Sequence, residues 1–514
     1  MGTDLIGCAR ERKPDVSETL PDDNDTGSSF LDCAVQIAQA IDNLEGRAEV
    51  ISLIAIKYAE SGQLDVAVDL AETIHDSYQR DQARAALAAK FIELGAADYA
   101  EKLCDLIEDD TAYALATEEM AVAYAESGEF EKSIAVAHRL ADSAPTLSRI
   151  ALTFVAGGHP VQALEVARSI DYPDLKAPVM VELAAHALHD GRNAEASELL
   201  QEATNAAEEI EFAEPRISIL VSIASLHGKC GQPAQALEIL ARAHQLCKQS
   251  EARAKDSALA QVAGGFAELH RYDQADEVIE EIENPFQFAH ANVKVALECY
   301  QAGDSTRALT LFADALEIGR DEEVYGAETL MLRETLLYKL AVCYATIGHR
   351  EEGLQVIGMM DSQDQQHRAL AEIAKLYVRT GNNSQVFEVT EMIKDEYARV
   401  LCELEIVDAF IASDQFALAD HMLLQALARA ATIERANQKA SSLMEIAPRL
   451  ARREQATKAS EVLFEALTAL QMIDDSYYQS HALINLAGKY LELGQPPGQR
   501  EQTVLEAIRL KLEP

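Results

Sequence analysis

The chain has 514 residues, of which 48% are apolar but only 6% aromatic, and its formal net charge is −42. This charge disfavours nucleic-acid binding, in which Lys and Arg replace the counterions of phosphates, and it disfavours adhesion to anionic membranes. It keeps a long Ala-rich chain soluble, and an acidic surface also fits a high-salt habitat.

The sequence contains no run of about 18 apolar residues, so no membrane insertion is expected, and the N-terminus lacks the apolar stretch of a signal peptide. Eight cysteines are scattered without any CxxC pair. That distribution is typical of reduced thiols in a cytosolic compartment. We therefore expect a cytoplasmic protein.

Residues 1–29 are polar and carry Pro14, Pro21 and the acidic cluster Asp22, Asp23 and Asp25. This composition predicts a disordered acidic tail. Residues 31–42, LDCAVQIAQAID, match residues 64–75, LDVAVDLAETIH. They predict a lone helix that caps the start of a helical array.

Residues 47–76 predict two amphipathic helices joined by a tight turn. Apolar residues recur at helical spacing on both sides of Gly62, where a helix end must enter the left-handed region. The same pattern recurs 13 times, with Gly at ten of the turns. The turn residues are Gly62, Gly95, Gly128, Gly158, Gly191, Gly231, His270, Gly303, Gly348, Gly381, Asp414, Glu454 and Gly494.

Three positions repeat with the turn. Seven residues before it, 12 of 13 copies have Ala; four before it, nine have Tyr or Phe; five after it, 11 have Ala, Ser or Gly. Small residues allow two helices to approach closely, and the aromatic fills the space between neighbouring hairpins. Because one hairpin cannot bury both of its apolar stripes, the copies must stack into a continuous core.

The pattern resembles the tetratricopeptide repeat (TPR), a helix-turn-helix of about 34 residues. Ala55, Tyr58, Gly62 and Ala67 stand where that family has its small residue, aromatic, turn glycine and packing alanine. The family's early Trp is missing, since the chain has none, and its closing Pro is mostly absent. A sibling α-solenoid class is the alternative. The resemblance implies an all-α, right-handed superhelical α-solenoid of about 13 antiparallel repeats.

The spacing of the turns suggests a domain plan. It varies from 30 to 45 residues, and in the long steps the second helix is expected to run on, as in residues 234–249. The widest step predicts the weakest join near Asn284. We therefore expect a first solenoid over residues 30–283, a second over 284–499 and a capping helix over 500–514.

Neither a metal site nor a catalytic site is predicted. His227 and Cys230 share a helix face, as do His244 and Cys247, but antiparallel helices would hold the two pairs about 10 Å apart. The sequence has no GxSxG, glycine-rich phosphate loop or HExxH motif. We expect no enzymatic activity and no cofactor.

Fifteen residues before the turn, 8 of 13 copies carry Arg or Lys. This basic column predicts a ladder of ion pairs between stacked hairpins, with a row of ligand-facing cations as the alternative. The eight residues are Arg47, Arg80, Lys176, Arg216, Lys255, Arg333, Arg399 and Lys439.

By analogy with TPR proteins, the first helices would line a groove. The expected groove-lining residues are Ser52, Ile56, Ala59, Ala85, Ala89, Ile92, Glu118, Val122 and Ala125. They lack the Lys, Asn and Arg of the family's clamp for acidic C-terminal peptides. A small, apolar groove suits a partner's helix or extended apolar segment.

One region is net positive, residues 435–458, and we call it the basic island. Its cations are Arg435, Lys439, Arg449, Arg452, Arg453 and Lys458. They predict an electrostatic docking site for an acidic surface, such as the belt 101–131 of a second copy, which has ten acidic residues and one basic. The alternative is that the arginines pair with acids on adjacent helices.

Taken together, these features predict a non-enzymatic protein–protein interaction scaffold or assembly factor. The alternative function is that of a regulatory or sensory subunit that binds a small ligand or peptide in the groove.

Overall fold

The computed structural model describes residues 28–250, 252–321, 329–494 and 497–511. Within these ranges every regular element is an α-helix, and the described part contains 27 of them. The tail expected over residues 1–29 lies outside the described residues except for Ser28 and Ser29, which begin α1.

The helices alternate along the chain between a first (A) and a second (B) helix of a hairpin. The A helices are α2 Leu44–Glu60, α4 Ser77–Glu93, α6 Asp110–Glu126, α8 Ala144–Ala156, α10 Pro173–His189, α12 Ala213–Lys229, α14 Ala252–Glu268, α16 Pro285–Gln301, α18 Leu330–Thr346, α20 Gln363–Arg379, α22 Glu396–Ala412, α24 Ala436–Arg452 and α26 Ser476–Glu492. The B helices are α3 Leu64–Glu72, α5 Ala97–Cys104, α7 Phe130–Ala137, α9 Pro160–Ser169, α11 Asn193–Glu209, α13 Pro233–Cys247, α15 Tyr272–Ile279, α17 Ser305–Arg320, α19 Arg350–Ile357, α21 Asn383–Thr390, α23 Phe416–Ala430 and α25 Ala456–Leu470. The remaining two are α1 Ser28–Gln39 and α27 Gln499–Leu510.

The varying step of the repeat comes from the B helices. In the short steps they have only 8–10 residues, as in α7 and α9, whereas in the long steps they have 15–17, as in α11 and α13. The predicted lengthening of the second helix is therefore confirmed, and each pair keeps the same turn.

All 13 predicted turns are confirmed by their backbone. The ten turn glycines have φ between +61° and +91°, and His270, Asp414 and Glu454 have φ of +57° to +61°. The turns close in the Schellman manner, as where the Gln63 N–H donates to the Tyr58 carbonyl at 2.9 Å. A left-handed residue costs glycine little but strains any residue with a Cβ.

Close contact between the two helices of a hairpin explains the small residues. All 13 residues seven before the turn are completely buried, including the exception, Val407. Opposite them lie the small residues five after the turn, as Gly353 shows: a Cβ added there would stand 2.9 Å from the Ala341 carbonyl oxygen. A larger residue at either position would push the helices apart.

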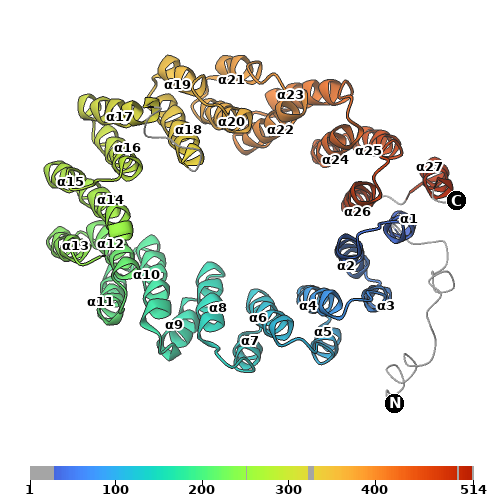
Figure 1. Ribbon diagram of the computed structural model, residues 1–514, viewed down its shortest axis with the longest axis horizontal. Coiled ribbons are helices and arrows are strands. Elements are labelled where there is room, and N and C mark those ends of the chain that lie inside the picture. Colours follow the sequence, from blue (N-terminus) through green and yellow to red (C-terminus); the bar gives the residue numbers. More distant parts are fainter. Residues whose placement is uncertain (1–27, 251, 322–328, 495–496, 512–514) are drawn as a thin grey trace. The chain divides into compact units, whose positions relative to one another are not determined.

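The chain divides into two compact units. Unit 1 joins residues 1–120 to residues 394–514, and unit 2 spans residues 121–393. This division differs from the expected one, since Asn284 falls inside unit 2, where α16 packs against α14 and α15. Within unit 2 the A helices form one layer and the B helices the other (Figure 1).

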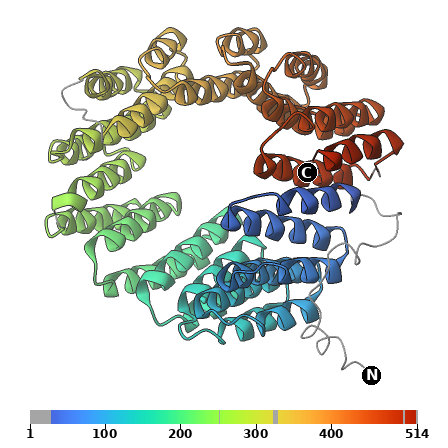
Figure 2. The ribbon, with the colours of Figure 1, turned by 45° about the vertical axis from the view of Figure 1, so that its right-hand side comes forward.

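Unit 1 brings the first helix of the described chain to its last hairpin. The A helix α26 packs most extensively against α1, while α27 packs against α1 and α25, and Figures 1 and 2 both show α1 beside α26. The repeat explains this arrangement: after the turn at Gly494 the small residue is replaced by Gln499, whereas α1 offers Ala34, which is completely buried. Helix α1 thus takes the B position of the thirteenth hairpin.

Specific contacts hold this junction. The rings of Phe30 and Tyr490 lie 4.7 Å apart between centroids, and Phe30 is completely buried. The Arg509 guanidinium donates to the Ser29 carbonyl at 3.3 Å. The expectation that residues 31–42 only cap the start of the array missed this second role.

We predict that Glu454→Gly stabilises the protein by about 0.5–1 kcal/mol, because it removes the strain of a left-handed Glu. The measurement is the free energy of unfolding in urea. The reverse change, Gly231→Ala, adds a Cβ that meets nothing within 4 Å, so its expected loss comes from the backbone alone. A stabilising effect of Gly231→Ala would contradict this account of the turns.

We predict that Phe30→Ala weakens the α1–α26 junction by about 3–5 kcal/mol, the usual loss for a buried Phe. Amides of α26 should then exchange hydrogen faster, while those of unit 2 keep their protection. Gln36→Ala, an exposed change on the same helix, is the control. Unchanged protection of α26 in Phe30→Ala would show that α1 does not hold that helix.

Candidate functional site

The basic column caps helices and does not form the predicted ion-pair ladder. Five of its eight cations donate to a carbonyl at the end of the preceding helix, where backbone acceptors lack partners and a positive charge is favoured. The pairs are Arg47 to Ile41 at 2.6 Å, Arg80 to Ile74 at 3.1 Å, Lys176 to Arg168 at 3.4 Å, Arg333 to Gly319 at 3.0 Å and Lys439 to Ala431 at 3.1 Å. Gln366 and Gln479 do the same in two other copies, so this is a structural position.

The next position along the chain serves the opposite end of a hairpin. Asp81 accepts from the backbone N–H groups of Glu108 and Asp109, both at 3.0 Å, just before the next A helix. Glu334 and Asp256 make the equivalent contacts in their copies. Burial by itself would raise the pKa of Asp81, but these N–H groups and the Arg84 guanidinium hold it below its ordinary value. These buried carboxylates therefore have structural roles.

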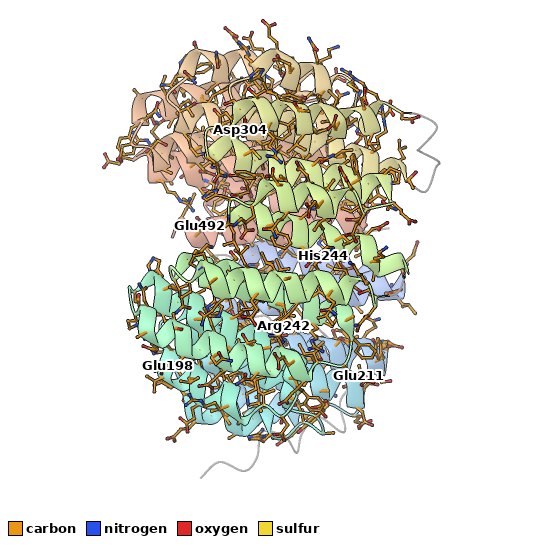
Figure 3. The ribbon with its side chains drawn as sticks, turned by 90° about the vertical axis from the view of Figure 1, so that its left-hand side faces the viewer. Glu198, Glu211, Arg242, His244, Asp304 and Glu492 are labelled. Carbon is orange, nitrogen blue, oxygen red and sulfur yellow. The ribbon has the colours of Figure 1, made fainter. Side chains whose placement is uncertain are left out.

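Ion pairs between hairpins lie instead on the B helices. In unit 2, Arg242 and His244 on α13 pair with Glu208 of α11 and with Glu281 after α15, the latter at 3.0 Å (Figure 3). Arg168 pairs with Glu202 at 2.7 Å, again from one B helix to the next. Exposed pairs of this kind contribute only about 0–1 kcal/mol each.

Most of the basic island is paired. Arg449 binds Asp408 of α22 at 2.7 Å and Glu445 at 3.2 Å, and Arg453 binds Asp420 of α23 at 2.8 Å. Arg452 pairs with Glu492 of α26 at 3.3 Å, and Lys439 with Glu465 at 3.1 Å. Arg435 and Lys458 have no carboxylate within 4 Å in the part of the chain that the structure describes.

These pairs weaken the electrostatic contrast on which the docking prediction depends, because the arginine charges are largely neutralised by neighbouring helices. Docking at this cluster stays a prediction, with Arg435 and Lys458 as its least compensated members.

The nine expected groove residues lie on α2, α4 and α6, and five of them are buried: Ala59, Ala85, Ile92, Val122 and Ala125. The other four are partly exposed, and a contact with a partner stays a prediction for Ser52, Ile56, Ala89 and Glu118.

Depressions in unit 2 offer a better-defined candidate. One, of about 350 Å³, crosses α10 and α12 and reaches α14 and α16; it is lined by Glu182, Ser218, Ser222 and Leu226, among others. A second, of about 400 Å³, lies between α14, α16 and α18. The two share Gln261 and Lys294, so they adjoin along the A-helix face of unit 2.

The signal that could have revealed this face is the position nine residues before the turn, which supplies Glu182, Ser222, Gln261, Lys294 and Lys339 in successive copies. The groove positions chosen by analogy are ten, six and three before the turn, so they point partly into the core. This shift by one residue explains why half of them are buried.

The histidines and cysteines considered for a metal have other partners. His227 bonds Gln232 at 2.7 Å and His244 pairs with Glu281. The described residues contain no group of three or more His, Cys, Asp or Glu side chains placed to hold a metal ion. Their seven cysteines are unpaired, and burial raises the pKa of several, including Cys247 to about 11.

None of the helices within the described ranges combines the length and apolar composition that crossing a membrane requires.

No protein-family model matches the chain, and no curated protein matches it. Several solved structures are similar. Ton1535 from Thermococcus onnurineus NA1 is 16% identical, with 72% of this chain and 98% of that chain covered and a TM-score of 0.25. A human IFIT1 dimer with m7Gppp-AAAA is 14% identical, with 88% and 96% covered and a TM-score of 0.30.

The APC/C hetero-tetramer Cut9–Hcn1 is 13% identical to this chain, with 79% of this chain and 87% of that chain covered and a TM-score of 0.26. TM-scores this low carry no argument about arrangement or function. The assignment of a helical-repeat fold rests on the repeated hairpins and their 13 left-handed turns.

We predict that Arg449→Glu destabilises the protein by about 1–3 kcal/mol, because it leaves Asp408 and Glu445 facing a like charge in a half-buried site. The Arg449 side chain is 17% exposed, whereas that of Arg452 is 67% exposed. Arg452→Glu makes the same charge change in the same island and should cost less than about 0.5 kcal/mol. Equal losses in urea unfolding would contradict the structural role of Arg449.

Proposed function

We propose that this TPR-like helical repeat protein is a non-enzymatic scaffold or assembly factor that binds a partner protein on the A-helix face of unit 2. The observation that supports this function is the pair of adjoining depressions, which extend from α10 to α18. An elongated surface built from successive helices matches an extended or helical segment better than a compact substrate.

The chemistry of the first depression favours a partner segment with small or apolar side chains. Its lining combines Val181, Ala185 and Leu226 with the hydroxyl groups of Ser218 and Ser222. Such a surface gains affinity from apolar burial and from a few hydrogen bonds, and it gives a highly charged segment little to bind.

The polar groups elsewhere also support a binding role over a catalytic one. The buried carboxylates Asp81 and Glu334 accept from backbone N–H groups, and the cations of the basic column donate to helix ends. Groups that complete helices in this way are committed to structure. We propose further that the basic island contributes electrostatic attraction at its rim, mainly to the rate of association.

We predict that Ser222→Arg abolishes or strongly reduces co-purification of the stoichiometric partner from the native cell. Ser222 is exposed in the first depression, so an Arg there fills the space and adds a charge. Gln245→Arg places an Arg on α13, on the B-helix side, and should leave binding unchanged. Nuclease treatment of both samples distinguishes protein from nucleic-acid bridging.

A partner retained by Ser222→Arg but lost in Gln245→Arg would place the binding surface on the B helices. Ligand turnover by the purified chain in a metabolite screen would contradict a non-enzymatic role.

A further inference from the structure

The second depression is chemically unlike its surroundings. It is a pocket of about 400 Å³ between α14, α16 and α18, with apolar walls that include Phe286, Val293 and Leu336 (Figure 1). Three nitrogen-bearing side chains, Lys294, Lys339 and His290, complete it. No carboxylate is among its lining residues, in a chain with 86 Asp and Glu against 44 Lys and Arg.

The repeat makes this contrast sharper. Lys294 and Lys339 both stand nine residues before their turns, in two successive copies. The same position is Glu in five other copies, at residues 119, 182, 372, 405 and 445. The pocket therefore lies where the pattern of charge along the A helices is locally reversed.

Lys339 is available to a ligand. Its Nζ contacts His290 Nδ1 at 3.2 Å, and no carboxylate of the described residues lies within 4 Å of it. An ammonium group can only donate, so Nδ1 accepts and the neutral ring carries its proton on Nε2. Burial, Lys339 and Lys294 all lower the pKa of His290, which agrees with a neutral imidazole.

Lys294 is held in place by an unusual feature of α14. A Cβ on Gly264 would stand only 2.4 Å from Lys294 Cδ, so the lysine stem lies across the bare backbone of that residue. Glycine inside a helix costs about 0.5–1 kcal/mol relative to alanine. Lys294 Nζ then reaches Glu268 at 3.2 Å, at the edge shared with the first depression. The glycine thus makes room for a cation that lines the pocket.

We infer that this pocket binds a small organic anion, with a carboxylate or phosphate group at Lys339 and Lys294 and an apolar part against Phe286, Val293 and Leu336. Its volume is in the range of small-molecule sites, which combine apolar walls with a few polar groups. The site goes beyond the scaffold function, and its test needs no partner protein.

Net charge favours a small anion over an acidic protein segment. Repulsion from a chain of net charge −42 grows with the charge of the ligand, so a mono- or dianion enters the pocket against far less repulsion than an acidic polypeptide. Within the pocket, where solvent screening is weaker, the two ammonium groups act at short range.

The test is a ligand-observed NMR titration of the full chain at low ionic strength with three probes that share a phenyl group. They are 3-phenylpropionate, phenyl phosphate and the neutral 3-phenylpropanamide. We expect saturable binding of one or both anions and none of the amide, and the two anions distinguish a carboxylate site from a phosphate site. Lys339→Met should weaken binding by about tenfold or more, as expected for loss of a charged hydrogen bond.

Lys90→Met is the matched control, since it makes the same charge change on an A helix of unit 1, where Lys90 pairs with Glu93. It should bind the probes as the parent protein does. Gly264→Ala tests the pocket differently: it displaces only the flexible end of Lys294, so the protein should fold normally and bind the anions more weakly.

Three results would overturn the inference: no binding of either anion, equal binding of the amide, or equal binding to Lys339→Met. A synthetic Glu-rich peptide serves as a fourth probe. If it binds where the small anions do not, and Lys339→Met abolishes its binding, the pocket recognises an acidic protein segment instead.

Discussion

The fold depends on close contact between the two helices of each hairpin. Thirteen completely buried residues on the A helices, all but one of them Ala, meet small residues on the B helices, and at Gly353 the backbones come so near that not even a methyl group fits. This contact explains why the repeat tolerates B helices of 8 to 17 residues, since the turn and the crossing stay constant while the free end of the helix varies. It also explains a composition rich in alanine and poor in aromatic residues, because the core is filled by short side chains at close range.

The same constraint determines how the chain is completed. A hairpin leaves an apolar stripe that another helix must cover, and the thirteenth A helix, α26, has no B helix with a small residue directly after its turn. Helix α1 supplies that residue as Ala34 and adds Phe30, so helices from both ends of the described chain share one core in unit 1. Unit 1 is therefore discontinuous in sequence, and its stability depends on contacts between residues more than 450 positions apart.

Charges follow a similar division of labour. Cations 15 residues before the turn satisfy the carbonyl end of one helix, and carboxylates one position later satisfy the N–H groups before another. Further pairs connect successive B helices. Most cations of this acidic chain are thereby engaged in structure, which is why two lysines that face a pocket free of carboxylates are informative. The basic island, in contrast, has high sequence density of charge but little of it uncompensated.

The sequence by itself determined the helices, the 13 turns and the small-residue columns, because these depend on local periodicity and on the backbone conformation of single residues such as Glu454. It could not show the partner of Arg449, the role of Arg80 or the exposed register of the A helices, because each depends on which side chain a neighbouring hairpin presents at a distance of a few ångströms. Only the tertiary structure decided that α1 completes the hairpin of α26, since a B helix without an A helix fits equally well at either end of a repeat pattern. For the same reason the α14–α18 pocket emerged only there: Lys294 and Lys339 are 45 residues apart, and the packing of α16 against α18 brings them into one cavity.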